Sequence, residues 1–135
     1  RAFAIGQSAI DEAVARERQE IERRTALYRG GREPISVEGR TAILVDDGLA
    51  TGATMKAAVR ALRPLARRVM AAAPVGAATT CAQLRGEVDG LVCLEEPLHF
   101  LAVGEFYRNF DPTSDDEVRT LLEQAQQDRN KSDRS

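Results

Sequence analysis

The sequence predicts an α/β fold built on a parallel sheet, and three apolar runs are the main evidence for it. The runs occupy residues 42–45, 69–75 and 91–94, with segments between them that are long enough for crossover helices. Their apolarity is continuous rather than alternating, which is typical of strands covered on both faces. Apolar residues recur at helical spacing over 55–65, so we expect a strand, a helix and a strand joined by a right-handed crossover.

Three further helices are predicted from local signals. The first covers residues 9–27, with Ser8 at its start and only a narrow apolar seam along its length. The second covers residues 78–85, before the last apolar run. The third begins with a capping box formed by Ser114 and Glu117. Its predicted buried stripe consists of Val118, Leu121, Leu122 and Ala125.

Length and composition fit one domain with a modest core. The chain has 135 residues, of which 43% are hydrophobic and 30% are charged. We expect the domain to cover residues 1–127. Residues 128–135 contain no apolar side chain to bury, so they are predicted to form a flexible tail.

Charge and cysteine content argue against several classes of protein. A net charge of −2 gives no electrostatic reason to expect a nucleic-acid partner. No apolar run approaches the roughly 20 residues of a membrane span, so no membrane is expected. The two cysteines and the single His have no metal-ligand spacing, which argues against a disulfide scaffold and a structural zinc site. Reduced thiols and a cytoplasmic location are therefore expected.

The segment AILVDDGLATGAT, residues 42–54, joins the first predicted strand to the first crossover helix and carries the clearest functional signal. In an open parallel sheet, ligands bind beyond the carboxyl ends of the strands. Gly48 and Gly52 allow close approach of the backbone to a ligand, and Thr51 and Thr54 add hydroxyl groups. The helix start favours a phosphate, whereas the adjacent carboxylates favour hydroxyl groups. A ribose 5-phosphate offers both.

Other phosphate motifs fit this segment less well. A P-loop requires a Lys where Ala53 stands, and the spacing of Gly48 and Gly52 differs from GxGxxG. Receiver domains place two acids after a strand, but the Lys that should follow a later strand is not found. A solvated strand end beside a helix cap would not explain the Thr-Gly-Ala-Thr that follows the acids.

The same segment resembles the signature of type I phosphoribosyltransferases, which bind phosphoribosyl pyrophosphate (PRPP) and have a Rossmann-like parallel sheet. The segments YRGGREP and CLEEPLHFLAVGEFYRNFDPTSDDEVRTLL resemble a group of predicted bacterial members. The resemblance implies that Asp46 and Asp47 bind the ribose 2- and 3-hydroxyls and act in catalysis. It implies a stacking role on the acceptor base for Phe100, whose alternative is a core aromatic, and backbone contacts to the base edge for Leu101. The implied 5-phosphate loop consists of Ala50, Thr51, Gly52, Ala53 and Thr54.

The resemblance implies transfer of the phosphoribosyl group from PRPP to an acceptor nitrogen base, with release of pyrophosphate. Mg²⁺ is the implied cofactor, held through PRPP and water near the acid pair, and a homodimer is one possible assembly. The 6-oxopurine enzymes carry an acid where this sequence has Ala50, so hypoxanthine and guanine are disfavoured acceptors. The identity of the acceptor stays open.

One part of the family pattern is missing from the sequence. Members bind pyrophosphate through a loop after an earlier strand, and no such strand precedes Ser8, so we expect that part of the domain upstream of Arg1. Arg29 and Arg32 could reach pyrophosphate from a mobile loop, although a surface loop is the simpler interpretation. A non-catalytic PRPP-binding regulator, and an interaction domain that uses the helix at 9–27, remain alternatives.

Overall fold

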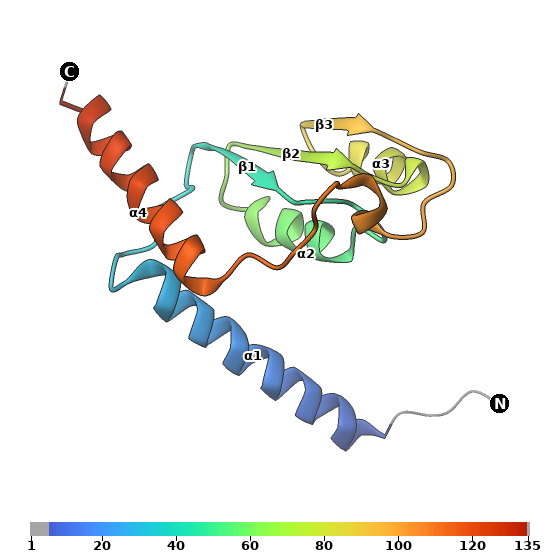
Figure 1. Cartoon of the computed structure of the whole chain (residues 1–135), viewed down its shortest axis with the longest axis horizontal. Coiled ribbons are helices and arrows are strands. Elements are labelled where there is room, and N and C mark those ends of the chain that lie inside the picture. The colour runs from blue at the N-terminus through green and yellow to red at the C-terminus, as the bar shows by residue number, and fades with distance from the viewer. Residues whose placement is uncertain (1–5, 135) are drawn as a thin grey trace. The chain divides into compact units, whose positions relative to one another are not determined.

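The computed structural model describes residues 6–134 and divides into two compact units. One unit is Ile35–Asp111, and the other combines the residues up to Pro34 with those from Pro112. The sequence predicted a single domain over residues 1–127. The first unit contains the sheet and the second contains the two long helices (Figure 1).

The sheet has three parallel strands in the order β1-β2-β3. Their bounds are Thr41–Val45 for β1, Arg68–Val75 for β2 and Gly90–Glu95 for β3. Helix α2, Ala53–Leu62, connects the first two strands, and helix α3, Ala78–Arg85, connects the last two (Figure 1). The predicted α/β fold with parallel strands is therefore confirmed, with each strand within one residue of its predicted bounds.

The hydrophobic core lies between the sheet and the helices α2 and α3. Along β2, alternate residues point into it, so Val69 is fully buried and Ala71, Ala73 and Val75 are nearly so. Helix α2 contributes the buried side chains of Met55 and Val59. Helix α3 contributes Cys81 and Leu84, and the turn after it contributes Val88.

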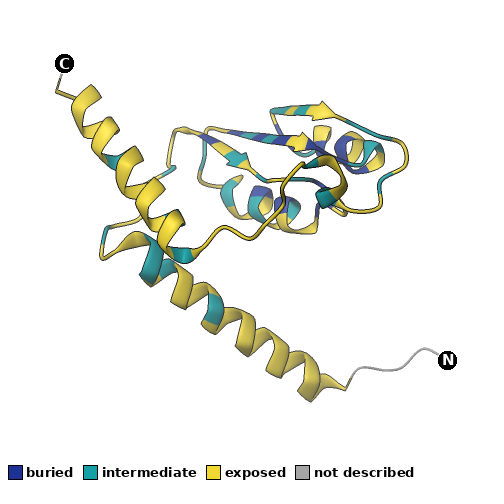
Figure 2. Ribbon diagram, in the orientation of Figure 1, coloured by how far each residue is buried: buried dark blue, intermediate teal, exposed yellow. Residues whose placement is uncertain are grey.

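The opposite face of the sheet is open in the described residues, which corrects the prediction that both faces are covered. Ile43 is 66% exposed, Val45 74%, Val92 55% and Leu94 76%. The pairing of Val45 with Ala72 and of Ala72 with Val92 places these side chains on one face. Figure 2 shows the resulting alternation of burial along the strands. The apolar runs are continuous, but only every second residue of them packs against α2 and α3.

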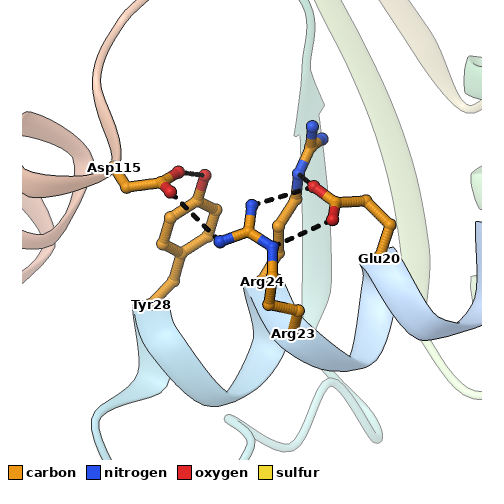
Figure 3. A network of polar contacts seen from close by, with 5 residues as sticks. All are labelled: Glu20, Arg23, Arg24, Tyr28 and Asp115. Atoms are coloured by element: carbon orange, nitrogen blue, oxygen red, sulfur yellow. Dashed lines mark hydrogen bonds and ion pairs between the residues drawn. The ribbon is translucent and has the colours of Figure 1, made fainter.

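Helices α1, Gln7–Arg29, and α4, Asp115–Ser132, are joined by a polar network in the second unit. Asp115 accepts a hydrogen bond from the Tyr28 hydroxyl at 2.7 Å and pairs with Arg23 at 3.1 Å (Figure 3). Glu20 in turn pairs with Arg23 at 2.9 Å. Neither helix contains a fully buried residue, and the Tyr28–Asp115 hydrogen bond is the partly buried contact of this network.

The ends of these helices differ from prediction in two places. The sequence placed Ser8 at the start of α1, but the helix begins one residue earlier with Gly6 as its N-cap, and the Ser8 hydroxyl donates to Glu12. Helix α4 continues to Ser132, so most of the predicted tail is helical.

The capping of α4 is confirmed, whereas its buried stripe is not found. The Ser114 hydroxyl accepts a hydrogen bond from the Glu117 N–H at 3.2 Å. Val118 is half-buried, and Leu121, Leu122 and Ala125 are exposed.

Among the helices of residues 6–134, none has the length and hydrophobicity needed to cross a bilayer.

Candidate functional site

The acid pair follows β1 at the carboxyl edge of the sheet. The Asp46 N–H donates to the Ala72 carbonyl at 3.1 Å, so the backbone stays attached to β2 for one residue beyond the strand. The Asp46 carboxylate accepts a hydrogen bond from the Asp47 N–H at 2.8 Å. Burial raises the pKa of Asp46, and this hydrogen bond partly opposes the rise. Asp47 is exposed, so the two carboxylates sit in different environments at one rim.

The loop after the acids is fixed to the sheet through Leu49. This side chain is 1% exposed, and its N–H donates to the Val75 carbonyl at 2.9 Å. The Leu49 carbonyl accepts from the Ala77 N–H at 2.8 Å, so the residue bridges both sides of the turn between β2 and α3. The residues on either side of Leu49 are therefore held at a defined distance from the sheet.

Gly52 is the residue that this loop requires most strictly. Its φ angle is +73°, in the left-handed region that disfavours residues with a Cβ atom. A Cβ built there would lie 2.7 Å from Cγ2 of Thr80. The second glycine of the motif thus serves both the backbone conformation and the close packing of the loop against α3.

The start of α2 is open to an anion. Gly52 is its N-cap and has no side chain to cap the helix, and its first turn carries no acidic residue. The Thr51 hydroxyl accepts from the Ala53 N–H at 3.3 Å. No carboxylate of the first turn therefore competes for the positive end of the helix dipole, where Ala53 and Thr54 begin the helix.

Thr80 supports the loop from behind, and sequence reasoning missed it. Its hydroxyl donates to the Ala50 carbonyl at 2.6 Å, and the residue is 6% exposed. Ala50 lies 30 residues earlier in the chain, so no local pattern in the sequence signals the contact. Of the predicted phosphate-loop residues, Ala50, Thr51 and Gly52 lie between β1 and α2, and Ala53 and Thr54 begin α2.

The segment after β3 contacts the backbone of the acid-pair loop. The Tyr107 hydroxyl donates to the Asp47 carbonyl at 2.5 Å. Val103, at the start of the 3₁₀ helix Val103–Phe106, fills the space beside Gly48, where a Cβ would lie 2.5 Å from its methyl groups. Burial raises the pKa of Tyr107, and the charges of the two acids add to the rise. Sequence reasoning also missed Tyr107 and Val103.

Phe100 and Leu101 lie in this same segment, and their assigned roles stay predictions. The Phe100 ring is half-buried and stacks on Phe106, with 5.4 Å between ring centroids and 16° between planes. Leu101 is 86% exposed. The segment that carries both residues reaches the acid pair through Tyr107.

The two arginines considered for pyrophosphate lie at the end of α1, in the other unit. The Arg32 guanidinium donates to the carbonyls of Tyr28, at 3.0 Å, and Arg29, at 2.8 Å. These bonds cap the last turn of the helix, which suits the surface-loop interpretation.

Similarity to known proteins agrees with this geometry. The phosphoribosyl transferase domain family matches residues 3–110. The chain is 43% identical over 129 residues to "Putative phosphoribosyl transferase MT0597" and "Putative phosphoribosyl transferase Rv0571c", from two strains of Mycobacterium tuberculosis. The alignments cover 95% of this chain but only 29% of each relative.

A solved structure supports the same conclusion. The crystal structure of TT1426 from Thermus thermophilus matches with a TM-score of 0.73 at 35% identity, over 87% of this chain and 57% of that one. The fold is α/β, and the acid pair and the loop that leads into α2 lie at the carboxyl edge of its parallel sheet. The chain belongs to the phosphoribosyl transferase domain family, as the segment 42–54 predicted.

Proposed function

We propose that the protein transfers the phosphoribosyl group of PRPP to an acceptor nitrogen base and releases pyrophosphate. One observation carries the proposal: a single loop presents two carboxylates at one end and a helix start without acidic side chains at the other. Asp46 and Asp47 form the first end, and Gly52 with Ala53 forms the second. These ends match the hydroxyl edge and the 5-phosphate of one sugar phosphate.

The acid pair acts on the ribose ring. Asp46 and Asp47 accept hydrogen bonds from the 2- and 3-hydroxyls and hold the ring in place. As the bond to pyrophosphate breaks, positive charge grows on the ring, and the nearby carboxylates favour that charge. No covalent link to the protein is needed. Mg²⁺ prefers carboxylate, phosphate and water oxygens, so this rim suits it, and when bound it neutralises charge on the leaving pyrophosphate.

The phosphate loop supplies binding energy remote from the reacting carbon. Residues Ala50 to Thr54 bind the 5-phosphate, and Thr80 holds the loop in the geometry that this requires. On the other side, Phe100 stacks on the acceptor base and Leu101 offers backbone groups to its edge. Ala50 carries no acid, which argues against a 6-oxopurine acceptor.

Pyrophosphate release tests the proposal. The intact gene product should release pyrophosphate from PRPP and Mg²⁺ in the presence of at least one member of a panel of nitrogen bases. The Asp46→Asn/Asp47→Asn variant should release none while keeping its circular dichroism spectrum. Saturable PRPP binding without release from any base would instead identify a non-catalytic PRPP-binding regulator.

A further inference from the structure

The two cysteines of the sequence lie together, although they are 12 positions apart. Cys81 is in the first turn of α3, and Cys93 is near the carboxyl end of β3. Glu96 follows that strand directly. The two sulfur atoms and a carboxylate oxygen of Glu96 all lie within 4.8 Å of one another. Neither cysteine takes part in the phosphoribosyl site, so this cluster has no role in the reaction described above.

The backbone leaves room for this cluster at Gly76. A Cβ built on Gly76 would lie 2.6 Å from Sγ of Cys81 and 3.3 Å from Sγ of Cys93, so both sulfurs face the same bare stretch of chain. Cys81 is fully buried and Cys93 is half-buried. The Cys93 thiol donates to the Glu95 carbonyl at 3.3 Å. One side of the cluster therefore remains accessible through Cys93.

Glu96 is oriented by an arginine on the same helix as Cys81. Its carboxylate forms an ion pair with the Arg85 guanidinium, whose Nη1 donates at 3.0 Å and whose Nη2 makes a shorter contact. Arg85 lies one helical turn after Cys81. The carboxylate is thus fixed beside the two thiols.

We propose that Cys81, Cys93 and Glu96 form a binding site for a thiophilic divalent cation of the Zn²⁺ type. Such a cation binds two sulfur ligands at about 2.3 Å in a tetrahedron, which places the sulfurs about 3.8 Å apart. The limit of 4.8 Å between ligand atoms fits this geometry after small side-chain rotations. A water molecule completes the four ligands.

Charge balance supports the assignment. On binding, the Cys81 and Cys93 thiols each release a proton to solvent and become thiolates. Two thiolates and one carboxylate carry three negative charges. The divalent cation neutralises two of these charges, so one negative charge remains. Arg85 neutralises that remaining charge while it continues to hold the second oxygen of Glu96. The arginine therefore acts as an outer partner of the ligand set.

The properties of the free thiols argue against a redox pair as the primary role. Cys81 is fully buried, so oxidants in the solvent do not reach its sulfur directly. Exposed thiolates are the form of cysteine that oxidants attack, and only Cys93 of the two is partly exposed. A divalent cation would stabilise both thiolates directly.

Cobalt titration tests the proposal with the full chain in its reduced, metal-free form. Co²⁺ should produce thiolate-to-cobalt charge-transfer absorption and tetrahedral d–d bands that saturate at one cation per chain, and Zn²⁺ should abolish both. The charge-transfer absorption requires sulfur ligands, so Co²⁺ bound at the carboxylates of the acid pair cannot produce it. The outcome is thus independent of the proposed transferase activity.

Three variants sharpen the experiment. Cys93→Ser removes one of the two sulfur ligands and should lose at least half of the charge-transfer absorption. Its partial exposure makes it the cysteine variant that folds most readily. Glu96→Gln should weaken Co²⁺ binding roughly 10–100-fold. Glu95→Gln, which changes the adjacent carboxylate outside the cluster, should leave the affinity unchanged.

Two results would overturn the site. One is a folded, reduced wild-type chain that shows no thiolate charge transfer at saturating Co²⁺. The other is a Cys81–Cys93 disulfide in protein isolated from the reducing environment of the cell. Such a disulfide would show that the pair is a structural cross-link and not a cation site.

Discussion

At the scale of a single residue, Gly52 sets both the backbone conformation and the packing of the proposed phosphate loop. Its positive φ angle turns the chain into α2, and its missing Cβ lets the loop touch Thr80. Thr80 in turn holds the Ala50 carbonyl. The phosphate loop therefore depends on one glycine and one buried hydroxyl as much as on the residues that would contact the phosphate.

Gly52→Ala should destabilise the sheet unit by more than the roughly 1–2 kcal/mol expected for a left-handed residue alone. Gly39→Ala is the matched control, because Gly39 has a φ of +68° and open space around its Cβ position. Urea unfolding of both variants isolates the cost of the Thr80 contact. Thr80→Ser removes the clashing methyl group but keeps the hydroxyl, so a double-mutant cycle should recover part of the loss. Equal costs for the two alanine variants would show that Thr80 does not limit the loop.

Tyr107→Phe should weaken PRPP binding roughly 2- to 10-fold, because the acid-pair loop loses one hydrogen bond of about 0.5–1.5 kcal/mol. The lost bond is the one to the Asp47 carbonyl at 2.5 Å. Tyr28→Phe removes the same atom from a hydrogen bond in the other unit, so it should leave PRPP affinity unchanged. Calorimetric titration measures both. Identical affinity in wild type and Tyr107→Phe would remove this residue from the site.

The raised pKa of Asp46 predicts that its ionised carboxylate lowers the stability of the ligand-free protein, although the same carboxylate is proposed to bind PRPP. A carboxyl group whose pKa is raised in the folded state favours folding below its unfolded pKa, and it loses that contribution as pH rises through the folded pKa. Ionised Asp46 therefore costs stability at neutral pH, chiefly because burial removes its hydration.

Asp46→Asn should accordingly make the ligand-free chain more stable at pH 7, while it weakens PRPP binding. The gain should shrink as the pH falls through the raised pKa of Asp46 in the folded state, and it should be gone below about 4, where an unfolded Asp is also protonated. Urea unfolding across this pH range provides the measurement. If Asp46→Asn were less stable than wild type at pH 7, burial of the ionised Asp46 carboxylate would not be the destabilising factor inferred here.

At the scale of elements, the two faces of the sheet should respond differently to substitution. Val69 is fully buried against the helices, whereas Ile43 on the other face is 66% exposed. Val69→Ala should cost roughly 2–3 kcal/mol of unfolding free energy, from lost apolar burial and the cavity left behind. Ile43→Thr should change it by less than about 0.5 kcal/mol. Comparable losses would mean that the Ile43 face is covered in solution.

The strands and crossover helices could be predicted because their signals are local. Apolar runs bounded by polar segments marked each strand, and the spacing of Met55, Val59 and Leu62 marked α2. What covers a face depends on other parts of the structure, so the open face of the sheet could not be inferred. The exposed stripe of α4 was mispredicted for the same reason, since a helical apolar stripe indicates a partner without supplying one.

The candidate site also contains residues of two kinds: some lie close together in the sequence, and others are brought to the site only by the fold. The acid pair and the proposed phosphate loop lie within one short segment, so residue types and spacing are enough to propose their roles, which stay predictions. Thr80 and Tyr107 reach the loop from 30 and 60 residues away, and only the fold brings them there. The Cys81 and Cys93 pair belongs to this second kind, because their spacing matches no metal motif.

At the scale of the whole molecule, the chain corresponds to one part of a larger family pattern. It spans 29% of the length of its mycobacterial relatives and 57% of the solved Thermus chain. The sheet unit holds the acid pair, the proposed phosphate loop and the segment that carries Tyr107, so binding of the sugar phosphate can be tested on this chain alone. Turnover is better tested on the intact gene product.

The most direct test is calorimetric titration of PRPP with Mg²⁺ into this chain and into Asp46→Asn/Asp47→Asn. The wild-type chain should bind at one site, and the double variant should bind at least about 100-fold more weakly, a loss of roughly 2.7 kcal/mol from two hydrogen bonds to charged groups. Circular dichroism should show the same fold in both. Equal affinity in the two folded proteins would contradict the assignment of the carboxylates to the ribose hydroxyls.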